Sequence, residues 1–498
     1  MRIKHLIILS TAIASGSGYA QSALAQSITV AEQFTARAGW ALESDDSNLL
    51  ARAGCLEPLT RIDFDGNLQP SLAISWAQTS PTIWEFTLRE GVKFQDGQPL
   101  TPEAVSNALN SLLKVTTPAR AFSPKLIKSV EASGNNTVRI TSHSPSVLLP
   151  YNVASPSTGI LSPAGYQNGR INPIGTCTGP FTVVRAAPRE GMTVKRNDNY
   201  WGGRAALAGA EIRFVPDGNT RAVQARSGEA QISVAIPSSA LHSLGSGLEI
   251  NNIDSPRTAT LIVNNKKPAL SDVRIRRAIQ AAIDTAGVAS AVYAGAAQPA
   301  VGPFGPKEPW APKEAKVAKY DPAYAKDLLK QAGVHVGALK LSLLAYNERG
   351  EFKDVAAVIQ AQLREVGIPV DVRVAEYAAL EPSMLSGEFD LALLSRNHLY
   401  DIADPFGFLA ADYTCAGSYN LSHYCNKDVD AKVEKAAASV DTAERHSLYA
   451  DMARLLQDEA VSIFLVHEQA IDAASKKVAN YRPHPHDSYL LTKDVSLR

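Results

Sequence analysis

The sequence lacks an excess of either charge, because its 498 residues include 49 Lys and Arg and 49 Asp and Glu. A protein that binds nucleic acid usually carries a basic surface, so this balance argues against nucleic acid as the partner. The sequence also lacks long apolar runs. Beyond the N-terminus, no stretch approaches the roughly 18 apolar residues of a transmembrane helix. We therefore expect a globular chain that does not itself span a membrane.

Common catalytic motifs are missing as well. The chain contains no G-x-S-x-G, no H-E-x-x-H and no P-loop pattern, which are typical of serine hydrolases, zinc peptidases and nucleotide-binding enzymes. We therefore expect a protein that is not an enzyme and needs no cofactor. The alternative is an exported hydrolase that uses Asp401 and Asp404 as an acid/base pair. Two carboxylates so close in one turn are poorly placed to flank a scissile bond.

The first 25 residues have the pattern of a cleavable export signal. Arg2, Lys4 and His5 precede a moderately apolar run at residues 6–14, and the small residues that follow end in Ala-Leu-Ala at residue 25. This order of regions is typical of a secretory signal peptide. No cysteine stands at the cleavage site, so we do not expect a lipid anchor there. The expected location of the mature protein is the periplasm.

Cysteines are few, and their even number favours disulfide bonds in an exported protein. The four cysteines permit three pairings. Cys415 and Cys425 are ten residues apart in a polar stretch with a glycine turn, which makes them the easiest pair to close and leaves Cys55 for Cys177. A metal site formed by Cys415, His423 and Cys425 is the alternative interpretation.

The pattern of secondary structure changes near residue 265. Residues 28–270 are dominated by short strand-like runs between Gly, Pro and Asn turns. After residue 271, amphipathic helical patterns alternate with apolar strand-like runs, which predicts βα units. A chain of this length is also too long for a single core. The sequence therefore predicts two lobes, with a cleft between them as the place for a small-molecule site.

Several helix starts are marked by capping residues. Thr101 before Pro102 and Asp321 before Pro322 combine a capping side chain with proline at the first helical position. Ser271 is expected to cap a further helix, whose apolar stripe runs through the stretch VRIRRAIQAAID.

Five sequence blocks occur in an order and spacing typical of one protein family. The first block contains Trp76, the pair Leu88–Arg89, Phe94 and the turn Asp96–Gly97. The later blocks read NPIGTCTGPFTVVR with VKRNDNYWGG, EIRFVPDGNTRAVQARSGEAQIS, VRIRRAIQAAID, and YDPAYAKDLLKQAGV. Over nearly the whole mature chain, the sequence resembles the extracytoplasmic solute-binding proteins of the peptide, nickel and opine family of ABC importers.

The resemblance implies an α/β, two-lobed periplasmic-binding-protein fold of the class II type, with an extra subdomain in the N-terminal lobe. It implies a monomer that captures a ligand between the lobes and hands it to an inner-membrane ABC permease. The expected division of the chain is a signal peptide at 1–25, lobe I at 26–265 with the subdomain at about 60–170, lobe II at 266–477, and a return to lobe I at 478–498.

The expected ligand loop lies within FDLALLSRNHLYDIADPFGFLAADYTC. The resemblance implies that Asp401, three residues before the Asp404–Pro405 pair, takes the α-ammonium group of a peptide. A buried ammonium group needs an ionised partner, or its desolvation prevents binding. Tyr400 and Asp404 belong to the same expected site. The alternative role for Asp401 is a helix or turn cap.

This loop departs from the peptide-binding pattern, which has Gly-Trp where this chain has SRNHLYD. Arg396 is similar to an arginine of the nickel-chelate branch that faces a carboxylate-bearing chelator, and a guanidinium group suits a carboxylate. His398 is a candidate metal ligand, although a lone histidine is more often an ordinary polar loop residue. Arg396 and Asp401 together would bind a zwitterion. The leading hypothesis is therefore a short peptide or peptide-like ligand with no resident metal, and the alternatives are an opine or a metal chelate.

Four further residues are weaker candidates. Phe34 and Trp40 are placed to line the cleft, with packing in the core as the alternative. Arg221 and Arg257 are candidates to contact a ligand carboxylate, but pairing at the surface is the favoured interpretation for both.

Overall fold

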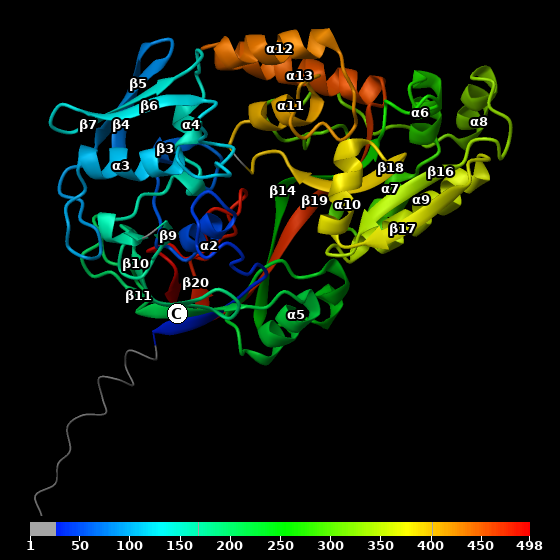
Figure 1. Ribbon diagram of the computed structural model, residues 1–498. Coiled ribbons are helices and arrows are strands. Elements are labelled where there is room, and N and C mark those ends of the chain that lie inside the picture. The colour runs from blue at the N-terminus through cyan, green and yellow to red at the C-terminus, as the bar shows by residue number, and fades with distance from the viewer. Residues whose placement is uncertain (1–25, 168, 401) are drawn as a thin grey trace, which may run out of the picture.

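The computed structural model describes residues 26–167, 169–400 and 402–498, which form two bodies side by side (Figure 1). An eleven-stranded sheet continues through both of them, in the order β10-β11-β12-β1-β13-β19-β14-β18-β16-β17, with β15 paired to β19. Its two longest strands, β14 (Leu248–Val263) and β19 (Ser462–Ser475), pair with each other and run from one body into the other. These two strands connect the bodies.

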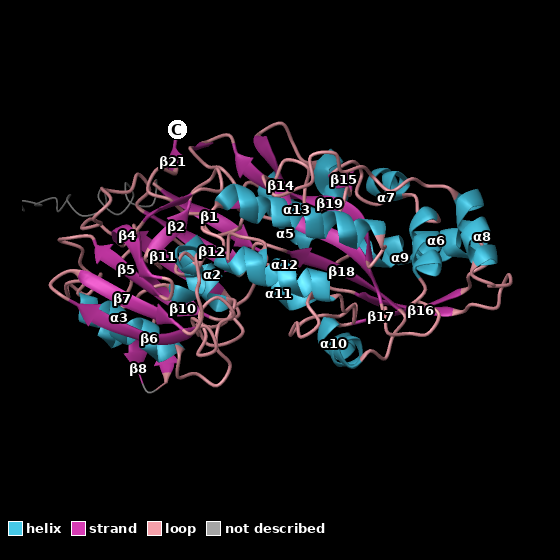
Figure 2. Cartoon of the chain, turned by 90° about the horizontal axis from the view of Figure 1, so that it is seen from above, coloured by secondary structure: helices cyan, strands magenta, loops and turns pink. Residues whose placement is uncertain are grey.

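The first body contains the N-terminal strands and a separate four-stranded sheet. In the large sheet, β1 (Ser27–Glu32) lies parallel to its two neighbours, β12 (Gly209–Phe214) and β13 (Ile232–Ser233). Beyond β12 follow the antiparallel strands β11 (Gly191–Arg196) and β10 (Phe181–Ala187). The separate sheet has the order β4 (Ala73–Ser80), β5 (Ile83–Leu88), β7 (Thr137–Ser142), β6 (Ile127–Ser133). Seen from above, it lies at the opposite end of the molecule from the helices α6 (Val273–Ala281) and α8 (Pro322–Gln331) (Figure 2).

Short elements complete the first body. The helices are α2 (Asp46–Arg52), α3 (Pro102–Leu112), α4 (Leu149–Asn152) and α5 (Gly218–Ser227), with the 3-10 turns η1 (Pro156–Thr158), η2 (Pro163–Gly165) and η3 (Ser238–Ser243). The short strand pairs are β2 (Thr60–Ile62) with β3 (Leu68–Pro70) and β8 (Tyr166–Gln167) with β9 (Arg170–Ile171). As predicted, Thr101 begins α3: its hydroxyl accepts a hydrogen bond from the backbone N–H of Ala104 at 3.2 Å.

The second body has the predicted alternation of strands and helices. β16 (Leu341–Tyr346) lies parallel to both β17 (Val370–Ala375) and β18 (Leu391–Asn397), and β15 (Ala297–Pro299) pairs with β19. The helices of this body are α6 (Val273–Ala281), α7 (Thr285–Ala291), α8 (Pro322–Gln331), α9 (Glu351–Glu365), α10 (Tyr377–Ser386), α11 (Phe406–Tyr413), α12 (Lys427–Ala438) and α13 (Thr442–Asp458).

Two predicted caps of the second body differ in outcome. Asp321 begins α8 as expected, since its carboxylate accepts from the backbone N–H of Tyr324 at 3.0 Å. The cap of α6 is Asp272 rather than Ser271, because the Asp272 carboxylate accepts from the backbone N–H of Arg274 at 2.8 Å. Both residue types are good caps, and the position at which the backbone turns into the helix decides between them.

Each body has its own apolar core. The first core is formed by residues of the N-terminal half together with Val478, Leu490, Leu491 and Val495 from the end of the chain. The second core is formed by residues between Ala259 and Val466. The end of the chain also forms a short strand pair, β20 (Val478–Ala479) with β21 (Ser496–Leu497). The C-terminal residues therefore lie against the first body (Figure 1).

Both expected disulfide bonds are present. Cys55 is bonded to Cys177 with a Cα–Cα distance of 5.4 Å, and Cys415 to Cys425 with a Cα–Cα distance of 4.4 Å. The alternative metal site at His423 is wrong, because the sulfur atoms of Cys415 and Cys425 are consumed by the disulfide.

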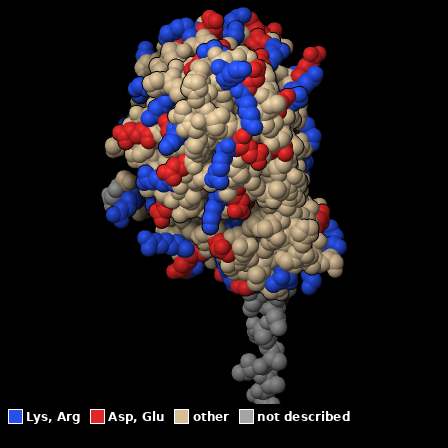
Figure 3. Space-filling model, turned by 90° about the vertical axis from the view of Figure 1, so that its right-hand side faces the viewer, with Lys and Arg blue, Asp and Glu red and all other residues tan. Residues whose placement is uncertain are grey.

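The outer face of the second body is mixed in charge. Figure 3 shows basic and acidic side chains interspersed over this face, in agreement with the equal totals in the sequence. In the part of the chain that the structure describes, no helix is both long enough and apolar enough to cross a membrane.

A buried histidine holds the returning C-terminal segment against the first body. The Nε2 of His484 donates to the carbonyl oxygen of Ile62 at 3.2 Å, and its Nδ1 accepts from the backbone N–H groups of His486 and Ser488. Burial lowers the pKa of His484 to about 4. Protonation of Nδ1 would remove an acceptor that two main-chain donors use.

Acid is therefore expected to destabilise the protein through His484. Above pH 6.5 neither state is protonated at this residue. As the pH falls from 6.5 to about 4, the unfolded chain binds a proton that the folded chain resists, and stability worth about 3 kcal/mol is lost. Urea unfolding at pH 7 and pH 4.5 measures this loss, which should be smaller in His484→Gln and unchanged in His335→Gln, whose side chain is exposed. An identical pH dependence in all three proteins would contradict the prediction.

Candidate ligand-binding site

Two parallel strands of the second body end at the same edge of the sheet. β16 ends at Tyr346 and β18 ends at Asn397. Ligands of open α/β sheets bind outside the carboxyl ends of the strands. The segment from His398 to Pro405, which we call the bridging loop, leaves this edge and leads into α11. Of the predicted ligand residues that the structure describes, this loop contains His398, Tyr400 and Asp404, next to the edge where a ligand site is expected. Arg396 lies within β18 itself.

The bridging loop contacts the first body on both sides of position 401. The hydroxyl of Tyr400 accepts a hydrogen bond from Nδ2 of Asn48 in α2 at 3.0 Å. Two small apolar clusters continue this contact, and their buried residues are Ile402 with Ala121 and Leu148, and Ala403 with Ile62 and Ala154. The two bodies therefore meet at this loop. Asp401 itself lies outside the described residues, and its role as the ammonium partner stays a prediction.

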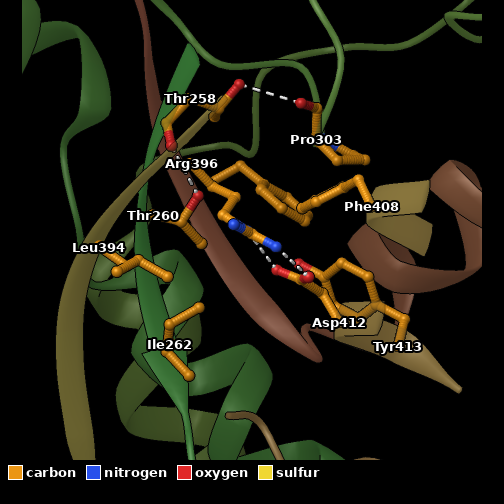
Figure 4. Close-up of a pocket in the computed structure, with 10 residues that line it drawn as sticks. Thr258, Thr260, Ile262, Pro303, Leu394, Arg396, Phe408, Asp412 and Tyr413 are labelled. Atoms are coloured by element: carbon orange, nitrogen blue, oxygen red, sulfur yellow. Dashed lines mark hydrogen bonds and ion pairs between the residues drawn. The ribbon is translucent and has the colours of Figure 1, made fainter. Parts of the chain in front are cut away.

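Arg396, at the end of β18, is held by a carboxylate of the protein (Figure 4). Its Nε and Nη2 donate to the two carboxylate oxygens of Asp412 in α11 at 2.9 and 2.8 Å. The guanidinium also lies over the ring of Tyr419, 4.6 Å from the ring centre. The hollow beside this pair, lined by β14, β18, β19 and α11, has room for roughly one water molecule. The predicted contact of Arg396 with a ligand carboxylate would thus compete with Asp412.

His398 is enclosed rather than exposed. Its side chain is 2% exposed, lies against the rings of Phe304 and Phe408, and bonds through Nε2 to Oε1 of Glu308 at 2.8 Å. Within residues 26–167, 169–400 and 402–498, no group of three or more His, Cys, Asp or Glu side chains is arranged to hold a metal. Metal binding by His398 stays a prediction that would require this pair to open.

Asp404 is buried and holds the bridging loop to α13. One carboxylate oxygen accepts from the hydroxyl of Tyr449 at 2.7 Å and from the backbone N–H of Phe406 at 2.9 Å. The other accepts from Nε of Arg445 at 3.2 Å. Burial and the Asp404 carboxylate raise the pKa of Tyr449. Both oxygens thus have internal partners, which gives Asp404 a structural function in the loop.

The two aromatic candidates near the first strand have different environments. Phe34 is 48% exposed on the segment that follows β1. Trp40 is 5% exposed, belongs to the first core and packs against Phe214. Its φ of 70° is unusual for a side chain of this size, and the bond from its backbone N–H to Asp46 at 2.9 Å stabilises it. Core packing is therefore what the structure shows for Trp40.

Arg221 is not paired at the surface, contrary to the favoured interpretation. It is 4% exposed and donates to the main-chain carbonyl oxygens of four residues in two loops. These acceptors are Val215, Pro216, Val234 and Ala235. The residue stabilises loop structure next to β13.

One charged pair at the same sheet edge has no signal in the sequence. Arg349, which follows β16, donates from Nη1 to Oε2 of Glu468 in β19 at 2.8 Å. The hydroxyl of Ser395 in β18 donates to the same oxygen at 3.0 Å. The two residues are 119 positions apart in the sequence, so no local sequence pattern predicts the pair. Arg257, expected at the surface, lies half-buried in this region.

Two cores joined by long strands, with a bridging loop where they meet, define a two-lobed α/β binding protein. Residues 67–420 match the family model described as bacterial extracellular solute-binding proteins, family 5 middle. The chain belongs to this family, whose members are extracytoplasmic binding proteins rather than enzymes. The predicted family and fold class are confirmed.

Relatives with different ligands are similar to this chain. The nickel-binding protein NikA of Staphylococcus aureus is 26% identical over 456 residues, with 90% of each chain covered. Di/tripeptide-binding protein 2 of Pseudomonas aeruginosa is 28% identical over 455 residues, with 84% of each chain covered. The crystal structure of NikA from Brucella suis in complex with Fe(III)-EDTA superposes with a TM-score of 0.84 at 24% identity, covering 95% of this chain and all of the other. These relatives include peptide-binding and nickel-binding components of ABC importers.

Proposed function

We propose that this protein captures short peptides or peptide-like zwitterions in the periplasm and delivers them to an inner-membrane ABC permease. Family membership and the similarity to a di/tripeptide-binding protein support the proposal. The observation that carries it is the bridging loop, whose Tyr400, Ile402 and Ala403 contact the first body.

The proposed device needs no chemical reaction. A ligand that touches both lobes stabilises the closed form by the difference between its affinities for the closed and open forms. The same proposal divides the chain into lobe I, at 26–265 and 478–498, and lobe II, at 266–477. Lobe I contains a subdomain at about 60–170. The proposal also includes a cleaved signal peptide at 1–25 and a monomeric protein. The bodies connected by β14 and β19 support the division into lobes.

A metal chelate is the second candidate, because a nickel-binding protein is among the relatives. Metal analysis of the purified protein, with and without nickel and free histidine, separates the two candidates. Stoichiometric nickel that appears only with histidine would favour the chelate. Peptide affinity that is unchanged after treatment with a chelating resin would favour the peptide.

The proposed function is tested by denaturing the protein purified from its natural host and identifying released compounds by mass spectrometry. We expect a small zwitterionic compound, and a rise in melting temperature when a panel of di- and tripeptides is added to the stripped protein. Release of no small molecule together with no thermal shift would overturn the proposal.

Replacing Asp401 by Asn is expected to weaken peptide binding at least about 30-fold. Removing one partner of a buried, hydrogen-bonded charge pair costs about 2 to 5 kcal/mol, and each 1.4 kcal/mol is about tenfold in the dissociation constant. Calorimetric titration with the peptide that gives the largest thermal shift measures the change. Asp354→Asn, on the exposed face of α9, is the matched control. Equal affinities of the two variants would exclude Asp401 as the ammonium partner.

A further inference from the structure

Arg257 stands in a bulge of β14 at the ligand-binding edge of the sheet. The pairing of β14 with β19 passes from Asp254–Gln469 directly to Thr258–His467, so the residues between are displaced from the ladder. Bulges of this kind redirect side chains and are common next to binding sites. On its other side, Arg257 pairs with Asn397, the last residue of β18. The bulge therefore places Arg257 where the bridging loop begins.

Arg257 is a half-buried cation that has no direct partner in the part of the chain that the structure describes. Among the described residues, its guanidinium makes no ion pair or hydrogen bond. The nearby charges are Arg349, which opposes it, and Glu468 and Asp487, which favour it. Both carboxylates are already engaged, Glu468 by Arg349 at 2.8 Å and Asp487 by Arg52 at 3.3 Å. Burial and Arg349 lower the pKa of Arg257, yet a guanidinium stays protonated in proteins.

Two other polar atoms of the same region lack a partner. Within the described residues, the Tyr293 hydroxyl and Oε1 of Glu468 are buried and make no hydrogen bond. The charges of Glu468 and Arg349 act on Tyr293, which places the three side chains near one another. A buried polar atom without a partner destabilises the folded protein, and an unpaired buried cation does so more strongly. Several such groups in one region indicate that a ligand supplies the missing hydrogen-bond and ion-pair partners.

We propose that Arg257 binds a free carboxylate group of the ligand, beside the Arg349–Glu468 pair. The planar guanidinium matches the geometry of a carboxylate, and Arg396 already has that partner in Asp412. The inference rests on the proposed function in taking the bridging-loop edge as the ligand site. It adds that the ligand carries an unblocked carboxylate and that this end of the ligand lies at Arg257.

Dipeptides and their C-terminal amides test this assignment on stripped protein. The variants are Arg257→Gln and, as a matched control, Arg226→Gln, whose exposed side chain lies in the last turn of α5. Wild type and the control should bind the free acids at least tenfold more tightly than the amides. Arg257→Gln should bind the free acids at least tenfold more weakly than wild type and lose the preference. Ligand-free Arg257→Gln should melt at the wild-type temperature or above it, because no described residue pairs with the cation that is removed.

The outcomes separate this inference from the proposed function. Arg257→Gln that binds the acids as wild type does, or wild type that binds acids and amides equally, would overturn the assignment and leave peptide binding intact. A melting temperature several degrees lower in ligand-free Arg257→Gln, restored in Arg257→Lys, would show a structural role and also overturn it. Wild type that binds neither acids nor amides and releases no small molecule would overturn the proposed function, and this inference with it.

Discussion

Replacing Asp404 by Ala is expected to lower the free energy of unfolding by about 3 to 5 kcal/mol. The carboxylate is 2% exposed and bonds to Arg445, whose side chain is 5% exposed. Alanine leaves that guanidinium buried without its counter-charge and removes the acceptor of the Tyr449 hydroxyl. Chemical denaturation of the ligand-free variant and wild type, followed by circular dichroism, measures the loss.

A surface pair provides the comparison for Asp404. Asp198 bonds to Arg196 and Arg204 but is 65% exposed, so Asp198→Ala should cost less than about 1 kcal/mol. Equal losses for the two alanine variants would contradict the structural function of Asp404. If the variant Asp404→Asn folds with wild-type stability but binds no peptide, the result would instead support the prediction that Asp404 contacts the ligand.

Removing the long-range disulfide is expected to have the second large effect. Cys55 and Cys177 are 122 positions apart, and Cys415 and Cys425 only 10. In the chain-entropy treatment, a cross-link stabilises by restricting the unfolded chain, which gives about 5 kcal/mol for the long loop and about 3 kcal/mol for the short one. The paired Ser variants, Cys55→Ser with Cys177→Ser and Cys415→Ser with Cys425→Ser, should differ accordingly in chemical denaturation.

The short-range pair serves as the internal control, because both variants lose one bond of the same type. Equal losses would show that loop length does not govern these disulfides. Wild type unfolded under reducing conditions should lose about as much stability as the sum of the two variants, provided that the sites are independent.

Local elements of the fold could be predicted because their signals are local. Thr101 and Asp321 cap their helices as expected, since a capping side chain bonds to a main-chain N–H two or three residues later. The missed cap at Ser271 shows the limit of this reasoning. Two adjacent residues had suitable side chains, and the position at which the backbone turns into α6 selected Asp272.

Side-chain partners in the candidate site could not be predicted. Asp404 meets Arg445 and Tyr449 because α13 packs beside the bridging loop, more than 40 positions away in sequence. Arg396 meets Asp412 because α11 brings that carboxylate to the end of β18. The sequence does not distinguish an arginine that binds a ligand from one that pairs with a carboxylate of the protein.

By itself, the sequence determined the export signal as an expectation, the α/β character, the family and the loop that follows β18. All of these depend on residues close together in the chain. Only the tertiary structure decided which charges near that loop are already neutralised. Among the described residues, it also showed that Arg257, on the neighbouring strand β14, has no partner. The reason is that charge pairing depends on distance in space, and burial sets its strength.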